Sequence, residues 1–202
     1  MLTKNNNRHP LKHPEQRVGV FIDVQNLYYS AKNIYGRKVN FGNIVKEALA
    51  GRKLIRAIAY VVRTESKEEQ PFFEALYNQG IETREKDLQI FSTGMKKADW
   101  DVGLAVDAIR LAPSLDAIVI VSGDGDYLPL VEYLQKSAGK QVEVAAFGET
   151  TSTKLVDEVD DFINLSEDLA KFLIFDRPMQ GQKMNRPGKP IAKAGAPNYS
   201  KK

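Results

Sequence analysis

The chain has 202 residues, 43% of them hydrophobic, and a net charge of +3, which together describe a folded domain of ordinary size. It contains no cysteine, which excludes disulfide bonds, thiolate nucleophiles and cysteine-ligated zinc and is typical of a reducing compartment. Residues 1–17 are polar and no apolar run reaches the roughly 18 residues that cross a bilayer, so we expect a cytoplasmic protein without a membrane segment.

The two ends of the chain differ in charge from the segment between them. Residues 1–17 carry a net charge of +3 and residues 176–202 a net charge of +6, which leaves −6 for residues 18–175. From Phe175 onward the sequence is rich in Pro, Gly, Lys and Asn, a composition that does not bury enough apolar surface to offset the entropy of ordering. We therefore predict a basic flexible arm at 1–16, one folded domain at 17–174 and a basic, disordered tail at 175–202.

Within the domain, short apolar runs alternate with longer helical patterns, as in βαβ units with a parallel sheet. In chain order we predict a strand at Val18–Asp23, a helix at Gln25–Ile34, a helix with Asn40 as its N-cap, a strand at Leu54–Val62, a helix at Lys67–Gln79, a strand around Ile81–Lys86, a helix at Asp101–Leu111, a strand at Ala117–Ser122, a helix at Tyr127–Ser137, a strand at Val142–Phe147 and a short strand near Phe162–Leu165. Gly80 and Gly139 stand where helix C-caps belong. The helix at 101–111 is apolar nearly all round, which predicts that it lies against the sheet rather than on the surface.

Aspartates follow two of the predicted strands at their carboxyl ends. Asp23 ends the first strand, and Asp124 and Asp126 come shortly after the strand Ala-Ile-Val-Ile-Val. Ligands of open α/β sheets bind outside the carboxyl ends of the strands, so we expect these carboxylates at one place, with Asp101 as a further member. Carboxylates held close together repel one another and favour a hard divalent cation, Mg²⁺ or Mn²⁺.

Such a site hydrolyses a phosphodiester by activating a water and stabilising the leaving oxygen, and it requires no histidine. This suits the chain, because its two histidines, His9 and His13, lie in the N-terminal arm.

Each aspartate also has a structural interpretation. Asp23 suits the N-cap of the first helix, Asp101 suits the N-cap of a later one, and Asp124 and Asp126 suit a Gly-rich turn in which Asp126 caps the next helix. Asp107 lies about 240° round the helix from Asp101, so we assign it a structural hydrogen bond.

Other side chains flank the predicted crevice. We take Lys97, Asp99, Arg63 and Ser122 as candidate substrate contacts, although a lysine pair such as Lys96 and Lys97 is as often a solvated surface feature. Trp100, Tyr28 and Tyr29 could either stack on bases or pack in the core, whereas Tyr127 is assigned to the core. The segment Glu149–Thr153 could either give hydroxyls to the crevice or cap a helix. We assign Asp160 and Asp161 to the surface.

Three segments of the chain resemble the motifs of the NYN domain family, in the LabA-like branch of the PIN-like nucleases. They are Phe-Ile-Asp23-Val-Gln-Asn26, then Lys97-Ala-Asp-Trp-Asp101-Val-Gly-Leu-Ala-Val-Asp107, then Val-Ser-Gly-Asp124-Gly-Asp126-Tyr-Leu-Pro-Leu. Their order and spacing extend the likeness over roughly residues 17–165. Members commonly have Lys-Gly before the aspartate of the middle motif, whereas Asp99 and Trp100 stand there in this chain, so Asp99 is an alternative to Asp101.

The resemblance implies a PIN-like three-layer sandwich, with a central, mostly parallel sheet of five to six strands and helices on both faces. It also implies that Asp23, Asp101, Asp124 and Asp126 form an acidic quartet that binds divalent metal, with Asn26 orienting the first carboxylate or a water. RNA is the implied substrate.

These observations favour a ribonuclease that uses Mg²⁺ or Mn²⁺ to hydrolyse single-stranded RNA, with a homodimer as one candidate assembly. The alternative is a catalytically weak RNA-binding or regulatory module of the same fold, since fold does not fix function. A phosphatase with an aspartyl nucleophile is disfavoured, because the second aspartate expected two residues after Asp23 is replaced by Gln25.

Overall fold

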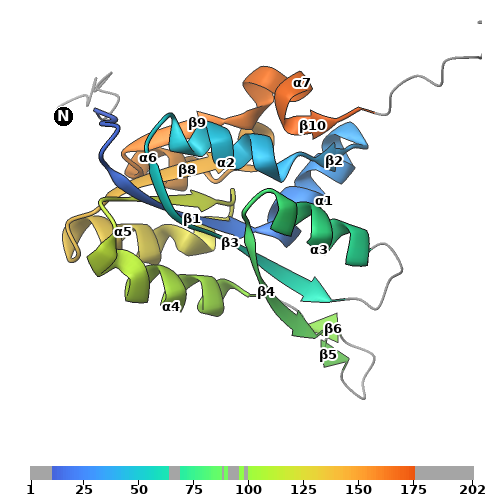
Figure 1. Cartoon of the computed structure of the whole chain (residues 1–202), viewed down its shortest axis with the longest axis horizontal. Helices are drawn as coiled ribbons and strands as arrows, with labels where there is room; N and C mark the ends of the chain where they lie inside the picture. The colour runs from blue at the N-terminus through green and yellow to red at the C-terminus, as the bar shows by residue number, and fades with distance from the viewer. Residues whose placement is uncertain (1–10, 64–68, 88, 91–95, 98–99, 176–202) are drawn as a thin grey trace, which may run out of the picture.

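A parallel sheet lies at the centre of the molecule, between two layers of helices (Figure 1). The computed structural model describes residues 11–63, 69–87, 89–90, 96–97 and 100–175. Within these residues the sheet has six strands in the order β4-β3-β1-β7-β8-β9, and each strand is parallel to its neighbours. The strands are β1 (Arg17–Asp23), β3 (Lys53–Arg63), β4 (Glu82–Asp87), β7 (Ala117–Val121), β8 (Gln141–Ala146) and β9 (Asp161–Asn164). The predicted α/β sandwich is confirmed.

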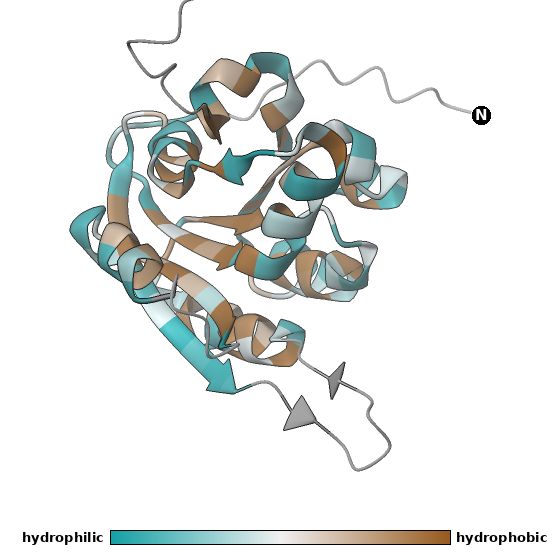
Figure 2. Ribbon diagram, turned by 90° about the vertical axis from the view of Figure 1, so that its right-hand side faces the viewer, coloured by the Kyte–Doolittle hydropathy of each residue, from teal (hydrophilic) through white to brown (hydrophobic). Residues whose placement is uncertain are grey.

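Helices cover both faces of this sheet, and the sheet separates two hydrophobic cores. On one face lie α1 (Val24–Tyr35), α2 (Phe41–Leu49), α3 (Glu69–Asn78) and the short α7 (Leu169–Phe172). On the other face lie α4 (Asp101–Leu111), α5 (Leu128–Lys136) and α6 (Thr153–Glu158). The central strands are hydrophobic and the edge strand β4 is hydrophilic, which disfavours pairing of that edge with another chain (Figure 2).

The predicted strands and long helices are all present, with ends that differ by one or two residues. Asn40 caps α2 as predicted, since its side chain accepts a hydrogen bond from the Asn43 N–H. Gly80 and Gly139 both adopt positive φ angles, +73° and +63°, after α3 and α5. The sequence did not predict the shortest elements: α6, α7, the antiparallel pairs β2 (Lys38–Val39) with β10 (Leu173–Ile174) and β5 (Gln89–Ile90) with β6 (Lys96–Lys97), and the 3₁₀ turns η1 (Ala112–Ser114), η2 (Gly125–Tyr127), η3 (Gly148–Thr150) and η4 (Leu165–Asp168). Segments this short have too few residues to show a period.

One prediction about α4 is wrong in part. The helix packs on the sheet through Leu104 and Ala108, but Val102, Val106 and Ile109 remain exposed on its outer side. A helix in the outer layer of a three-layer sandwich can bury only the side that faces the sheet, so its other apolar residues meet solvent.

Charged side chains are buried at the opposite end of the sheet from the predicted site. Arg52 donates to both carboxylate oxygens of Glu143, at 2.6 and 2.9 Å, and both side chains are fully buried. Lys12 forms ion pairs with Glu143 at 3.1 Å and with Asp161 at 2.8 Å. Asp161 is mostly buried, contrary to the predicted surface position. Asp160 is exposed as predicted, although its carboxylate accepts from the Val142 N–H at 2.7 Å.

Most of the two predicted basic arms, residues 1–10 and 176–202, lies outside the described residues. Among the residues that are described, no helix is long and apolar enough to cross a membrane.

We expect the Arg52→Ala variant to lose about 3 kcal/mol of unfolding free energy, because it leaves the buried Glu143 carboxylate without its bidentate partner. Urea unfolding followed by circular dichroism measures this loss. The matched control is Lys136→Ala, which removes ion pairs of an exposed lysine with Glu132 and Glu158 and is expected to cost less than about 1 kcal/mol. Equal losses in the two variants would contradict the importance of the buried pair.

Candidate active site

The strand order creates a crevice at the carboxyl ends of β1 and β7. Counted along the chain, the sheet has the doubly wound order 3-2-1-4-5-6, and ligands of such sheets bind where the order reverses. Here the reversal falls between β1 and β7, which are neighbours in the sheet. Asp23 ends β1 and Asp124 follows β7, so the topology brings together two carboxylates that are far apart in the sequence.

Asp23 is held by hydrogen bonds on both of its carboxylate oxygens. Its Oδ1 accepts from the Asn26 N–H at 3.0 Å and so caps α1, while its Oδ2 accepts from the Ser122 hydroxyl at 3.2 Å. The capping interpretation is therefore correct, but capping uses only one oxygen. Ser122 is fully buried, so it contacts Asp23 rather than the space in which a substrate lies.

The turn after β7 is fixed by contacts with α1 and with the loop after β8. The Gly123 N–H donates to Asn26 Oδ1 at 3.0 Å, and within the described residues the Asn26 side-chain nitrogen has no hydrogen-bond partner. A Cβ atom on Gly123 would lie only 2.9 Å from the Thr150 carbonyl oxygen, so this close approach requires glycine. Asp124 caps the short helix η2 by accepting from the Asp126 N–H at 3.0 Å, and Asp126 does not cap α5 as the alternative predicted.

Asp101 is positioned by the aromatic residue that precedes it. Trp100 donates from its indole nitrogen to the Val61 carbonyl near the end of β3, at 3.1 Å, and its ring packs directly against Gly103. These contacts fix the start of α4 beside the crevice, with Asp101 as the first residue of the helix. A carboxylate there is stabilised by the helix dipole. Trp100 therefore has a packing role, which is one of the two roles predicted for it.

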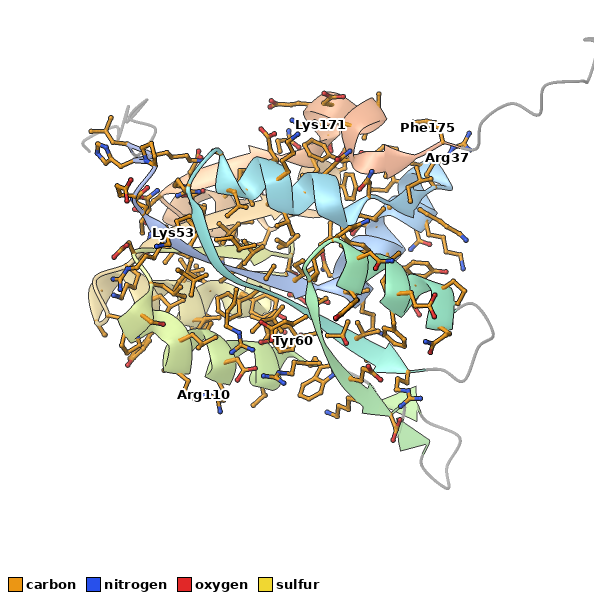
Figure 3. All side chains as sticks on the ribbon, in the orientation of Figure 1. Arg37, Lys53, Tyr60, Arg110, Lys171 and Phe175 are labelled. Atoms are coloured by element: carbon orange, nitrogen blue, oxygen red, sulfur yellow. The ribbon has the colours of Figure 1, made fainter. Side chains whose placement is uncertain are left out.

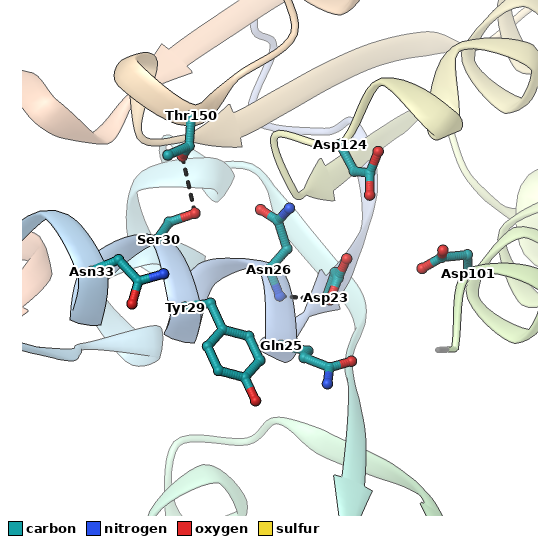
Figure 4. Close-up of a pocket in the computed structure, with 9 residues that line it drawn as sticks. All are labelled: Asp23, Gln25, Asn26, Tyr29, Ser30, Asn33, Asp101, Asp124 and Thr150. Carbon is teal, nitrogen blue, oxygen red and sulfur yellow. Dashed lines mark hydrogen bonds between the residues drawn. The ribbon is translucent and has the colours of Figure 1, made fainter. Parts of the chain in front are cut away.

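A pocket of about 350 Å³ opens between these elements, and its two sides differ chemically (Figure 4). Asp23, Asp101 and Asp124 lie on one side with their carboxylates turned toward a common space. The other side is uncharged and consists of Gln25, Asn26, Tyr29, Ser30, Asn33 and Thr150.

Tyr127 joins two of the carboxylates. Its ring is buried in the core, as predicted, but its hydroxyl donates to Asp101 Oδ1 at 2.9 Å and lies 3.5 Å from Asp23 Oδ2. Burial and the neighbouring Asp23 and Asp101 carboxylates raise the pKa of Tyr127 far above its ordinary value, so the hydroxyl keeps its proton. The sequence did not predict this role, although Tyr127 directly follows the Asp-Gly-Asp motif.

The electrostatics of Asp23 are unfavourable in the absence of a cation. Burial raises the pKa of its carboxyl, and the nearby Asp101 and Asp124 carboxylates raise it further. Hydrogen bonds from the Asn26 N–H and the Ser122 hydroxyl act in the opposite direction but do not cancel the effect. An added positive charge in the pocket would relieve this cost.

The three carboxylates fit a hard divalent cation in charge and in donor type. In the described part of the chain, however, no three acidic or histidine side chains are already close enough to hold a metal ion together. Binding would therefore require the carboxylate side chains to move closer together.

The remaining predicted site residues lie away from the pocket or outside the described residues. Asp126 is exposed and does not line the pocket. Arg63 ends β3, is half-exposed and lies 3.4 Å from Glu85. Lys97 lies in β6, but its side chain is outside the described residues, as is the whole of Asp99.

Asp107 has the structural role that the sequence predicted. It accepts from the Tyr60 hydroxyl at 3.0 Å, and this bond joins α4 to β3. It also accepts from Arg110 of the same helix at 2.9 Å. Figure 3 places Tyr60 between the sheet and α4, and Arg110 on the outer side of that helix.

Part of the uncharged side of the pocket was not predicted. Gln25, Ser30 and Asn33 were not among the candidate residues, whereas Tyr29 and the segment that contains Thr150 were considered. A signal does exist in the sequence, because Gln25, Tyr29 and Asn33 follow one another at intervals of four residues on α1.

The fold and the carboxylates at its switch point define a PIN-like α/β domain. The NYN domain family model matches residues 17–167, and the chain belongs to this family.

Two relatives and one solved structure are similar to the chain. The Low amplitude and bright protein LabA of Synechococcus elongatus is 26% identical over 162 residues, which cover 75% of this chain and 84% of that protein. An uncharacterised protein of Methanocaldococcus jannaschii is 30% identical over 161 residues, 76% of this chain and 57% of that longer protein. The crystal structure of a protein of unknown function from Vibrio parahaemolyticus superposes with a TM-score of 0.73 at 30% identity, over 82% of this chain and all of that one. These matches place the chain in the LabA-like part of the NYN family.

We expect the Asp23→Asn variant to be more stable than the native protein at pH 7 without divalent metal. Asparagine retains the N-cap acceptor but carries no charge, so it removes the cost of an ionised carboxylate whose pKa is raised by folding. The loss of unfolding free energy caused by ionised Asp23 is absent at pH values below the pKa of about 4 that Asp23 has in the unfolded state. It reaches its full size at pH values above the raised pKa of Asp23 in the folded state. Urea unfolding across this range should show the difference between the two proteins vanish as the pH falls.

The control for this prediction is Asp116→Asn, because Arg17 holds the pKa of Asp116 well below its usual range. Neutralising Asp116 is therefore expected to lower stability at pH 7, the opposite sign. Stabilisation by both substitutions would contradict the electrostatic explanation.

Proposed function

We propose that the protein is a divalent-metal-dependent ribonuclease that hydrolyses phosphodiester bonds of single-stranded RNA. One observation carries the proposal: carboxylates from three separate elements, β1, α4 and the turn after β7, line one pocket at the switch point of the sheet. Membership of the NYN domain family supports RNA as the substrate class.

The chain's own residues divide the work in this proposal. Asp23 and Asp124 are the principal metal ligands, and Asp101 and the more exposed Asp126 complete the acidic group. Ser122 and the Asn26 N–H fix the orientation of the Asp23 carboxylate. When bound, Mg²⁺ or Mn²⁺ supplies an activated water and a positive charge that stabilises the leaving oxygen.

Basic groups outside the pocket would bring RNA to this acidic site. We propose Arg63 and Lys97 as phosphate contacts, with Asp99 sharing the role of Asp101 in the acidic group. The basic residues at the two ends of the chain would add sequence-independent attraction to the phosphate backbone, which weakens as salt rises.

The test is cleavage of end-labelled single-stranded and structured RNAs in Mn²⁺, Mg²⁺ or EDTA. The variant Asp23→Asn/Asp124→Asn is expected to lose at least about 100-fold in rate, since even residues that only orient metal ligands contribute about 10- to 100-fold. Asp157→Asn, an exposed aspartate on α6, is the matched control and should cut at the native rate. Cleavage that persists in EDTA or in the double variant would contradict the proposal.

Metal binding can be measured without RNA. Mn²⁺ is expected to raise the melting temperature of the native protein, because a ligand that binds only the folded state stabilises it by mass action. The rise should be absent in Asp23→Asn/Asp124→Asn and retained in Asp157→Asn. An equal rise in all three proteins would place the ion elsewhere.

A second candidate function is RNA binding without cleavage. The observation that favours it is that, within the described residues, no three acidic or histidine side chains already lie close enough to hold a metal ion together. If the native protein binds the RNA panel but leaves every member intact with either metal, this second function replaces the first.

A further inference from the structure

The two sides of the pocket suit different parts of a nucleic acid. The carboxylate side, once neutralised by metal, suits a phosphodiester. The opposite side, which we call the neutral wall, consists of Gln25, Asn26, Tyr29, Ser30, Asn33 and Thr150 and carries no charged group. Lacking a cation, it does not suit a second phosphate, but amides, hydroxyls and an aromatic ring suit an uncharged base and ribose.

Part of the neutral wall is held rigid. Thr150 donates to the Ser30 hydroxyl at 2.9 Å, which joins the loop after β8 to α1, and Ser30 itself is buried. Asn26 is fixed by the Gly123 N–H. These contacts set the position of α1 relative to the carboxylates before any ligand arrives.

The rest of the wall has groups free to bind. Among the described residues, the amides of Gln25 and Asn33 have no hydrogen-bond partner, although both line the pocket. The Tyr29 side chain is 50% exposed, and its only ring contact in the described structure is an edge contact with Tyr28. Figure 4 shows Tyr29 between Gln25 and Asn33 along α1.

We infer that the neutral wall binds one unpaired nucleobase beside the phosphodiester at the carboxylates. The base stacks on the Tyr29 ring, and the amides of Gln25 and Asn33 hydrogen-bond to its edge, as carboxamides do with bases. This inference rests on the proposed function and deepens it, because it makes the site selective for single-stranded RNA. A volume of about 350 Å³ lies at the lower end of the range for small-ligand pockets and suits one nucleotide rather than a duplex.

The experiment compares two ligands of equal charge that differ only in their bases. One is a fluorescein-labelled octaribonucleotide, and the other is a ribose-phosphate chain of the same length without bases. Fluorescence anisotropy in the presence of Ca²⁺ measures the binding of each ligand to the full chain. The proteins compared are the native protein, Tyr29→Ala, Tyr29→Phe and Tyr77→Ala. Tyr77 is an 82% exposed tyrosine on α3 and is the matched control.

We expect the native protein to prefer the intact RNA by about tenfold, within the range that one stacked base contributes. Tyr29→Ala should lose this preference by weakening only the intact RNA, whereas Tyr29→Phe and Tyr77→Ala should keep it. A preference that survives in Tyr29→Ala, or an equal weakening of both ligands, would overturn the inference while leaving the ribonuclease proposal in place. Binding of neither ligand by the native protein would instead overturn the RNA assignment on which the inference rests.

The amides are tested separately with octamers of A, C, G and U. Asn33→Ala and Gln25→Ala are expected to change the order of affinities among the four octamers without changing the affinity for the chain that lacks bases. An unchanged order in both variants would exclude the edge contacts.

Discussion

The carboxylate of Asp23 stands at the carboxyl end of the central strand, largely out of contact with water, and the surrounding contacts serve to hold its charge there. An N–H from the first turn of α1 and the hydroxyl of Ser122 both donate to it. These contacts are insufficient to offset burial and the two neighbouring carboxylates, so the pKa of Asp23 remains raised. Folding thus stores an unfavourable interaction that a divalent cation can relieve.

The need to hold the Asp23 carboxylate also explains why several elements contact one another around it. Trp100 fixes the start of α4 through Val61, and Gly123 allows the loop after β8 to approach β7. Both features hold other elements close to Asp23. Sites that depend on position to within an ångström need this kind of support from elements that are themselves well packed.

The position of α1 has a second consequence. The helix begins at the carboxylate that it helps to hold, so its next two turns extend along the pocket and present uncharged side chains opposite the acidic group. One structural element therefore contributes both to the acidic side and to the neutral wall. The separation of the acidic side from the neutral wall follows from where one helix starts and which way it runs.

Much of this arrangement was determined by the sequence alone. Apolar runs and turn residues predicted the strands and the long helices. The rule that ligands bind at the carboxyl ends of parallel strands predicted that Asp23 and Asp124 lie close together. Both inferences depend on local patterns or on general topology. The motifs around these residues were also sufficient to indicate the NYN family.

Only the tertiary structure decided the remaining features, because they depend on distances between segments remote in sequence. Sequence periodicity does not reveal that Arg52 meets Glu143 in the core, that the Tyr127 hydroxyl reaches Asp101, or that α4 leaves an apolar side in solvent. The polar residues of α1 were visible as a helical repeat, but a polar helix face is by default a solvated one. Only the tertiary structure places that face across a pocket from three carboxylates, because the two sides come from segments that are remote in sequence.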